Sequence, residues 1–345
     1  MNVAYLNTPT LRNSHNSSLE QEFSSKVQET SFAKIFKDFR YPNEPFEEEK
    51  LQEHLQDVKP GRILVTTGSE RAFFTANVAQ RLLRKTPENF NKNKFFFRGI
   101  VVLDINPQIK KYVDYNILLL RLARSKEEYQ ELSTSTELSD IKNYIEIRLE
   151  EEAANGNLPE DMKKYYLNNL VELHQHYHCF DLDSPEHPFF HQQAWRSESV
   201  FEKLKYWKKD SDFYPIHELA KSGNIIAITG DIQNLSFLKR KKISLIDISN
   251  IPEFIKPSEW EWKIENKTHP RILRTYLPPP YNKKSYTINS NEQVKLICNP
   301  EQIHFISYPY DTPLSHTHYQ WTVDNGKTNT LRLKPQYYQP ACNIS

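Results

Sequence analysis

The stretch Leu64–Ala76, LVTTGSERAFFTA, decides the fold of this chain. The four residues LVTT are apolar or β-branched, as in a buried strand, Gly68 predicts a tight turn, and Ser69 opens a helix. The chain of 345 residues holds seven glycines, whereas average usage near 7% would give about 24. A glycine kept in such a chain marks a position that needs its conformational freedom. Gly68 and Gly230 both follow apolar runs and precede helix-start signals, which predicts a ligand site at these turns.

Strands and helices alternate outward from this stretch. The strands that we expect cover Arg62–Thr67, Gly99–Asn106, Asn224–Ile232, a run within Lys242–Phe254, and Arg271–Leu277. Continuous apolar runs such as GIVVLDIN are typical of strands buried on both faces of a parallel sheet. Helices are expected at about 71–85 and 107–129, the second capped by Asn106 with Pro107 as its first residue. The alternation predicts an α/β fold with a doubly wound, mostly parallel sheet.

Between residues 133 and 223 the chain departs from this pattern. An amphipathic helix is expected at Leu138–Leu149, another after Asn157-Leu158-Pro159, and two more at Glu198–Lys208 and Tyr214–Lys221. We interpret 133–223 as a helical insertion that caps the site within an α/β domain spanning 59–345. Residues 1–58 are expected to form an N-terminal arm and an entry helix. The first thirty-odd residues are expected to be flexible or loosely attached, because Ser, Asn and Gln dominate there. Short strands at 294–298, 304–307 and 319–323 predict an antiparallel C-terminal edge.

Composition argues against several classes of partner. The 45 basic and 44 acidic residues nearly cancel, so strong capture of nucleic acid or anionic membrane by the whole surface is not expected. The basic run Lys239–Lys242 is expected to be a solvated helix end, with a phosphate-contacting or nuclear-localisation role as the alternative. Three widely spaced cysteines, Cys179, Cys298 and Cys342, predict no disulfide framework and fit a reducing, cytoplasmic location. No apolar run reaches the ~20 residues of a membrane span; export by a route without an N-terminal signature stays open.

Polar residues stand where the predicted strands end. In a parallel α/β sheet, ligands bind beyond the carboxyl ends of the strands, where helix N-termini offer unpaired N–H groups. Each signal alone is weak, because Asp and Asn are common at turns. The ordered set is stronger, because independent turns need not fall at consecutive strand ends. In strand order the candidates are Thr66, Thr67, Gly68, Ser69 and Glu70; Asp104; Gly230, Asp231 and Ile232; and Asp247, Ser249 and Asn250.

This ordered set resembles the class I S-adenosylmethionine (SAM)-dependent methyltransferase fold, and more narrowly a sparsely characterised group of bacterial methyltransferase-like proteins. The likeness spans about 62–254 and is carried by TTGSERAFFTA, VLDIN, YNILLLRLARSKEEY, TGDIQ and DISNIPEF. The chain departs from it in three ways. The usual GxGxG turn is reduced to one glycine, and Thr66 stands near where many methyltransferases have an acidic residue. The spacing from Gly68 to Asp104 also exceeds the ~20 residues of a dinucleotide fingerprint.

The resemblance implies roles for the candidates. Gly68 and its neighbours Thr66, Thr67, Ser69 and Glu70 would face the methionine part of SAM. Asp104 would take the ribose hydroxyls. Gly230, Asp231 and Ile232 would form the adenine end, and the catalytic pair beside the transferable methyl would be Asp247 and Asn250.

Glu70 favours SAM over other cofactors. A carboxylate at a helix start repels pyrophosphate and suits an ammonium or sulfonium, and neither a Walker loop nor a full dinucleotide fingerprint occurs. The predicted function is methyl transfer from SAM to an unknown acceptor, a small molecule or a protein. Two alternatives stay open: a non-catalytic interaction protein, such as a secreted bacterial effector on a degenerate methyltransferase scaffold, and another Rossmann enzyme that uses a nucleotide.

Five histidines gather in the insertion: His174, His176, His178, His187 and His191. Two pairs have the i, i+4 spacing that can present two imidazoles to a metal, but no HExxH occurs and Pro185 and Pro188 interrupt the helix pattern. We predict no metal site. The histidines are expected at the mouth of the cleft or on the surface of the insertion, with a catalytic-base role as the alternative.

Overall fold

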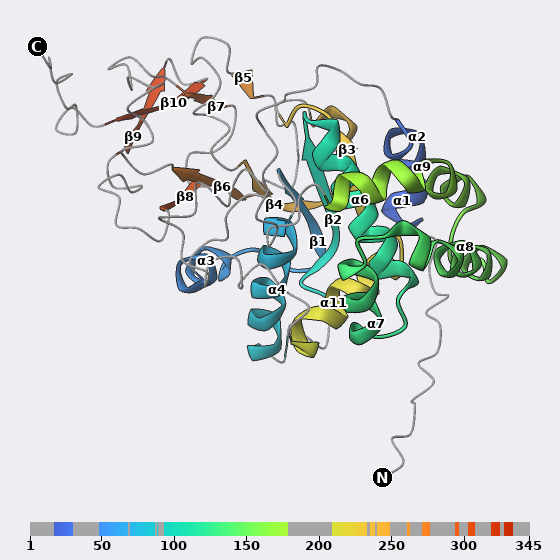
Figure 1. The fold of residues 1–345 in the computed structure, drawn as a ribbon. Helices are drawn as coiled ribbons and strands as arrows, with labels where there is room; N and C mark the ends of the chain where they lie inside the picture. Colours follow the sequence, from blue (N-terminus) through green and yellow to red (C-terminus); the bar gives the residue numbers. More distant parts are fainter. Residues whose placement is uncertain are drawn as a thin grey trace, which may run out of the picture.

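The computed structural model describes most of the chain up to residue 248 and several strands beyond it. The described residues are 17–29, 48–67, 70–86, 88, 93–178, 209–232, 235–238 and 240–248, and then 261–262, 271–276, 294–296, 303–307, 319–324 and 328–333. Figure 1 shows these parts as ribbons coloured along the chain.

Six strands form the central sheet. They are β1 (Arg62–Thr66), β2 (Phe97–Asp104), β3 (Ile225–Thr229), β4 (Ile243–Asp247), β6 (Arg271–Tyr276) and β8 (Ile303–Ser307). Their order is β3-β2-β1-β4-β6-β8, and every neighbouring pair is parallel. The predicted α/β class and parallel sheet are therefore confirmed, and the order is compatible with a Rossmann-like fold. Because the chain runs from β1 out to β3 and then returns to β4, the order reverses between β1 and β4, where such sheets bind ligands.

Helices cover one face of β1, β2 and β3. They are α4 (Glu70–Lys85) and α6 (Pro107–Leu122), and a third helix, α11 (Asp210–Lys221), packs against both of them. The start of α6 is as predicted, since the side chain of Asn106 accepts a hydrogen bond from the N–H of Gln108 at 3.0 Å and proline follows it.

The predicted end of α6 at about Tyr129 is wrong. The helix ends at Leu122, because Ala123 is extended (φ −61°, ψ 139°). A new helix, α7 (Lys126–Thr134), then starts under its own cap: the Ser125 hydroxyl accepts from the N–H of Glu128 at 3.2 Å. A serine three residues ahead of a glutamate is the usual helix-start signal, so this break could have been found from the sequence.

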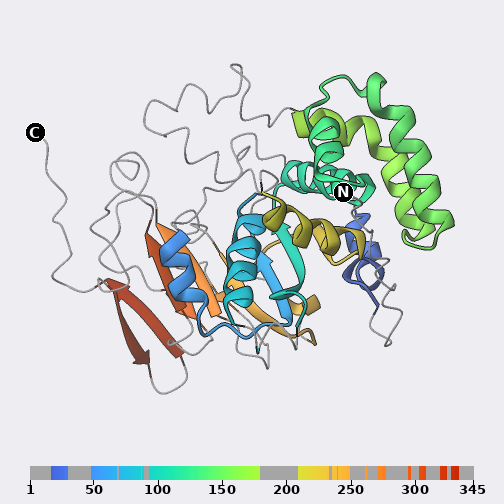
Figure 2. The same ribbon diagram turned by 90° about the horizontal axis from the view of Figure 1, so that it is seen from below.

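The insertion stacks outside α6. Helices α8 (Leu138–Ala154) and α9 (Glu160–His178) occur where the sequence predicts them; α9 packs along α6, and α8 packs on α9 (Figures 1 and 2). Because α6 lies between the sheet and α9, each of its residues except Gln108 is buried. The helix predicted at 198–208 lies outside the described residues, and the cap role and the boundaries 58/59 and 133/223 stay predictions.

Residues 17–29 do not form the flexible or loosely attached arm that the sequence predicts. Residues 17–29, called the clasp below, contain α1 (Leu19–Glu22) and α2 (Ser24–Val27) and dock against β3. Leu19, Phe23 and Val27 are buried. A Cβ at Gly99 on β2 would lie 2.5 Å from Cδ1 of Leu19, so the missing side chain of Gly99 permits this approach. The expectation of a loose arm is therefore wrong for the clasp.

The C-terminal strands divide between two sheets. The predicted strand at 304–307 is β8, which joins the central sheet parallel to β6 instead of forming an antiparallel edge. A second sheet, ordered β5-β7-β10-β9, contains β5 (Glu261–Trp262), β7 (Val294–Leu296), β9 (Tyr319–Asp324) and β10 (Thr328–Leu333). Within it, β10 pairs antiparallel with β7 and β9, so the antiparallel expectation is confirmed for these strands alone.

The predicted entry helix is also present. It is α3 (Glu48–Leu55), which precedes the central sheet in the chain and packs on α4.

Candidate functional site

The ends of β2 and β3 meet as the sequence requires. Asp104 and Thr229 are register partners, and the N–H of Gly230 donates to the carbonyl oxygen of Asp104 at 2.8 Å. The half-buried Asp104 also accepts the N–H of Asn106 on Oδ1 at 2.8 Å. This bond shapes the turn into α6. Two of the predicted cofactor loops are thus brought side by side at the carboxyl edge of the sheet.

The ends of β1 and β4 meet at the point where the strand order reverses. Thr66 and Asp247 are register partners, and the N–H of Thr67 donates to the carbonyl oxygen of Asp247 at 3.1 Å. The Thr66 hydroxyl lies 3.2 Å from the carbonyl oxygen of Thr67 and 3.5 Å from Oδ2 of Asp247. Thr66 and Asp247 are both 0% exposed, so these two predicted site residues lie beneath the edge of the sheet.

A buried ion pair holds Asp247. Nη2 of Arg71 lies 2.8 Å from Oδ1, and Nε lies 2.8 Å from Oδ2, with both side chains 0% exposed. Such two-point pairing of guanidinium and carboxylate fixes geometry as well as charge. It ties the first turn of α4 to the end of β4. Our sequence reasoning missed Arg71, although a cation in the first turn of a helix opposes the helix dipole and therefore signals a dedicated partner.

Several predicted site residues are not placed. Gly68, Ser69 and Asn250 lie outside the described residues, as does Ser249. Glu70 begins α4, but its side chain is outside the description. The electrostatic role of Glu70 and the catalytic roles of Asn250 and Asp247 stay predictions.

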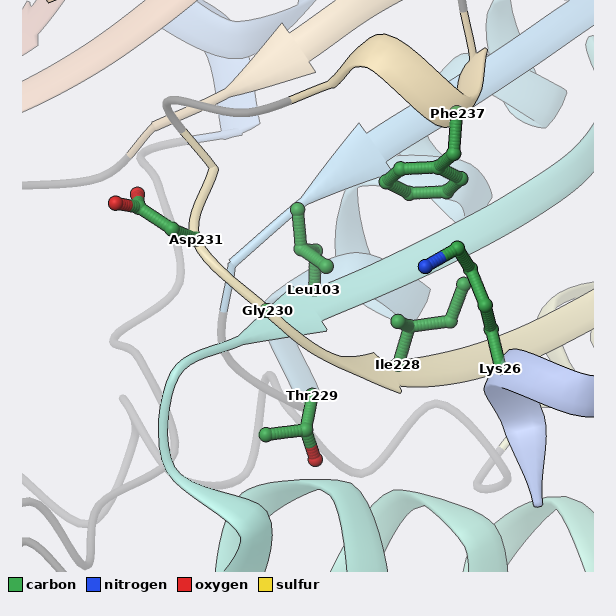
Figure 3. A pocket seen from close by; sticks show the side chains of 7 residues that line it. All are labelled: Lys26, Leu103, Ile228, Thr229, Gly230, Asp231 and Phe237. Atoms are coloured by element: carbon green, nitrogen blue, oxygen red, sulfur yellow. The ribbon is translucent and has the colours of Figure 1, made fainter. Parts of the chain in front are cut away.

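A pocket of about 350 Å³ lies beside the end of β3 (Figure 3). Its lining comes from α2, β2, β3, the turn after β3 and the 3₁₀ helix Ser236–Leu238. The residues are Lys26, Leu103, Ile228, Thr229, Gly230, Asp231 and Phe237. A Cβ at Gly230 would lie 3.0 Å from Cδ1 of Leu103, so the bare backbone helps keep the pocket open. The predicted residue Ile232, which follows Asp231 in the chain, is buried at 2% exposure and does not line the pocket.

The two ends of this pocket differ in character. Figure 3 shows Lys26, Leu103, Ile228 and Phe237 pointing toward one another, whereas the carboxylate of Asp231 points away from them. The sequence pattern predicted Gly230 and Asp231 as site residues, but it did not predict the other residues that line the pocket. Lys26 and Phe237 come from segments far apart in the chain, and no local pattern joins them.

Two histidines of α9, His174 and His178, pack against Tyr115 on α6. The rings of His174 and His178 lie 4.4 Å apart, and His174 contacts Tyr115 edge-on at 5.6 Å. Nε2 of His174 lies 3.2 Å from the carbonyl oxygen of Ser135. Burial lowers the pKa of His174, opposed by this backbone contact and by the charge of Glu137. The expectation of a cleft or surface position is wrong for His174, which is 5% exposed because α9 lies on α6.

The described residues show neither a metal-binding cluster nor a membrane-spanning helix. Those residues hold no cluster of three or more His, Cys, Asp or Glu side chains that could bind a metal ion; His187 and His191 lie outside them. No helix within them has the length and apolar character needed to cross a membrane. No protein-family model matches the chain, and a search of curated proteins gives no significant match.

Proposed function

We propose that the protein is a methyltransferase-like protein that binds SAM along the carboxyl edge of β1, β2 and β3. The observation that carries the proposal is the junction of Asp104 and Gly230, whose backbones are hydrogen-bonded at 2.8 Å. This junction lies one strand from the point where the strand order reverses, where parallel sheets of this order bind ligands.

The residues at this junction fit an adenosine group. A carboxylate such as that of Asp104 accepts hydrogen bonds from two neighbouring hydroxyls, as a ribose diol requires. Gly230 keeps the adjacent surface free of a side chain. In this proposal the turn at Gly68 and Ser69 faces the methionine part, and Asp231 and Ile232 lie at the adenine end.

The chain would position the reactants. SAM supplies an electrophilic methyl group when bound, and alignment of donor and acceptor provides much of the rate enhancement in such a transfer. The carboxylate of Asp247 is paired with Arg71, so in this proposal it holds α4 against β4. Asn250, which follows β4, keeps the proposed role of orienting the acceptor.

Calorimetric titration of the full chain with SAM and with its demethylated product tests the proposal. We expect both to bind, and Asp104→Asn to lower the affinity about 10-fold or more, because hydrogen bonds to a charged group contribute about 1.5–3 kcal/mol. Asp140→Asn, an exposed aspartate on α8, is the matched control and should bind as the parent does. A folded parent protein that binds neither compound would reject the proposal.

A second candidate, an interaction protein without catalysis, has its own supporting observation. The buried pair Arg71–Asp247 lies at the point where the strand order reverses, and its charges are engaged with each other rather than with a ligand. A fold can be retained after its active site is lost. Thermal shift measurements with SAM, NAD and ATP separate the candidates, because a ligand that binds the native state raises the melting temperature. Stabilisation by NAD or ATP alone would favour the nucleotide-using enzyme, since the six-strand order is also that of dinucleotide-binding sheets. No stabilisation by any of the three would favour the interaction protein.

A further inference from the structure

The clasp is anchored at the edge strand β3 by buried polar contacts. The carboxylate of Glu20 accepts from Nη1 and Nη2 of Arg121 on α6 at 2.6 and 2.7 Å, and the two side chains are 3% and 1% exposed. The N–H of Glu20 donates to the carbonyl oxygen of Gly223 at 2.9 Å, and the N–H of Leu19 donates to Asn224 at 3.3 Å. These bonds fix the position of α1, and therefore of α2, relative to the sheet.

The clasp brings a lysine to the pocket. Nζ of Lys26 lies 5.4 Å from the centre of the Phe237 ring, and both residues line the cavity (Figure 3). Phe23 meets the same ring edge-on, with centroids 5.6 Å apart and an interplanar angle of 88°. An aromatic face attracts an ammonium without cancelling its charge. Phe237 therefore holds the cation at the wall and leaves its positive field in the cavity.

A neighbouring lysine shows the contrast. Lys241 lies 5.7 Å from the centre of the Phe23 ring and also forms an ion pair with Glu22. Lys26 forms no ion pair with any carboxylate that the structure describes. Asp231, the acidic residue of the lining, points its carboxylate away from Lys26 (Figure 3). Among the described residues, no carboxylate neutralises the positive charge that Lys26 brings to this wall of the pocket.

The apolar part of the lining lies on the sheet face opposite α6. Successive strand residues point to opposite faces, so Leu103 points away from the side taken by Asp104. Figure 3 shows the same alternation on β3, where Thr229 points toward α6 and Ile228 points into the pocket. The apolar part of the pocket therefore lies on the sheet face opposite the Asp104 side chain, while Gly230 and Asp231 line the pocket and also belong to the adenine end of the proposed SAM site.

We propose that this pocket binds a nucleoside monophosphate, with the base on Leu103, Ile228 and Phe237 and the phosphate at Lys26. Pockets for small molecules begin at about 300 Å³ and combine apolar walls with a few polar groups. A cavity of about 350 Å³ suits a mononucleotide and is small for a dinucleotide. Lysine binds phosphate as a point charge, and here the clasp supplies it.

Calorimetry on the full chain tests this with AMP, GMP, CMP and UMP, each beside its nucleoside, and with inorganic phosphate. We expect at least one monophosphate to bind, its nucleoside to bind 10-fold more weakly or worse, and the affinity to fall with added salt. Lys26→Gln should lose a similar factor, while Lys26→Arg retains binding. Lys241→Gln, which removes the compensated lysine on the same face, is the matched control and should stay within about twofold of the parent.

Four results would overturn the proposal. They are the failure of all four monophosphates to bind, equal binding of a nucleoside and its monophosphate, equal behaviour of Lys26→Gln and Lys241→Gln, and inorganic phosphate binding as tightly as the nucleotide. Hydrogen exchange over residues 17–29 in Lys26→Gln shows whether the clasp stays docked. A loss of binding counts in favour only when that protection is kept. If protection is lost, the result for Lys26→Arg decides.

Discussion

Replacing Glu20 by glutamine should undo the docking of the clasp. Glu20 and Arg121 form a two-point ion pair in which both side chains are almost completely buried. Removing one charge leaves the guanidinium buried against an amide, and breaking a buried pair from one side costs about 3–5 kcal/mol. The neighbouring Glu22 in the same helix is the matched control. Its pair with Lys241 is 25% and 22% exposed, and exposed pairs contribute about 0–1 kcal/mol.

Two measurements report the loss. Urea unfolding followed by circular dichroism gives the change in global stability, and hydrogen exchange over residues 17–29 gives the change in local docking. Both are needed because a short segment can detach while the sheet stays folded. We expect Glu20→Gln to reduce protection in the clasp by about 100-fold or more, and Glu22→Gln to reduce it by less than about fivefold.

An apolar replacement of both partners separates charge from packing. A buried ion pair is often replaced by hydrophobic residues at no cost in stability, so Glu20→Leu combined with Arg121→Met should regain most of the protection that Glu20→Gln loses. The reasoning is refuted if Glu20→Gln and Glu22→Gln behave alike, or if the double variant is no better than Glu20→Gln.

Three further changes test other parts of the structure. Asp247→Asn should lower the free energy of unfolding by about 3–5 kcal/mol, because it leaves Arg71 buried without its counter-charge; a loss below 1 kcal/mol in urea unfolding would contradict this. Gly99→Ala should cost about 1–3 kcal/mol through the contact with Leu19, and Leu19→Ala in that background should relieve the clash, so strict additivity of the two losses would argue against it. Burial lowers the pKa of His217 from its usual 6.5, so its contribution to stability is complete above about pH 6.5 and is lost as the pH falls through the folded-state pKa. The urea midpoint should therefore fall less steeply below pH 6.5 in His217→Gln, and an unchanged slope would show that another group is responsible.

The strands and their end residues could be predicted because their signals are local. A continuous apolar run such as 100–103 can satisfy its backbone only inside a sheet that is covered on both faces. The sequence Asn106-Pro107 contains both parts of a helix start. The same kind of signal also marks the clasp: Leu19, Phe23 and Val27 recur at helical spacing behind the capping residue Ser18. The prediction of a flexible or loosely attached arm is wrong there, because it rests on the polar composition of the segment and not on the helical spacing of its apolar residues.

The details of the site were not predictable in this way. Arg71 and Asp247 are 176 residues apart, and nothing near either residue specifies the other. The wall of the pocket joins Lys26 to Phe237 across an even longer stretch of chain. Such pairs follow from the strand order, and a local pattern predicts the strands without their order. The candidate loops could therefore be located, while the charges that face them could not.

The clasp also imposes an order of events during synthesis. Its contacts at the edge strand reach across 205 residues, from Leu19 to Asn224, and the chain leaves the ribosome at about 5–20 residues per second. The docking surface for Leu19, Phe23 and Val27 is therefore complete only roughly ten seconds or more after they emerge. Until β3 has been made, the nascent chain exposes this apolar stripe. Contacts between such distant residues form slowly. A chaperone that covers the apolar stripe during this interval would protect the nascent chain from aggregation.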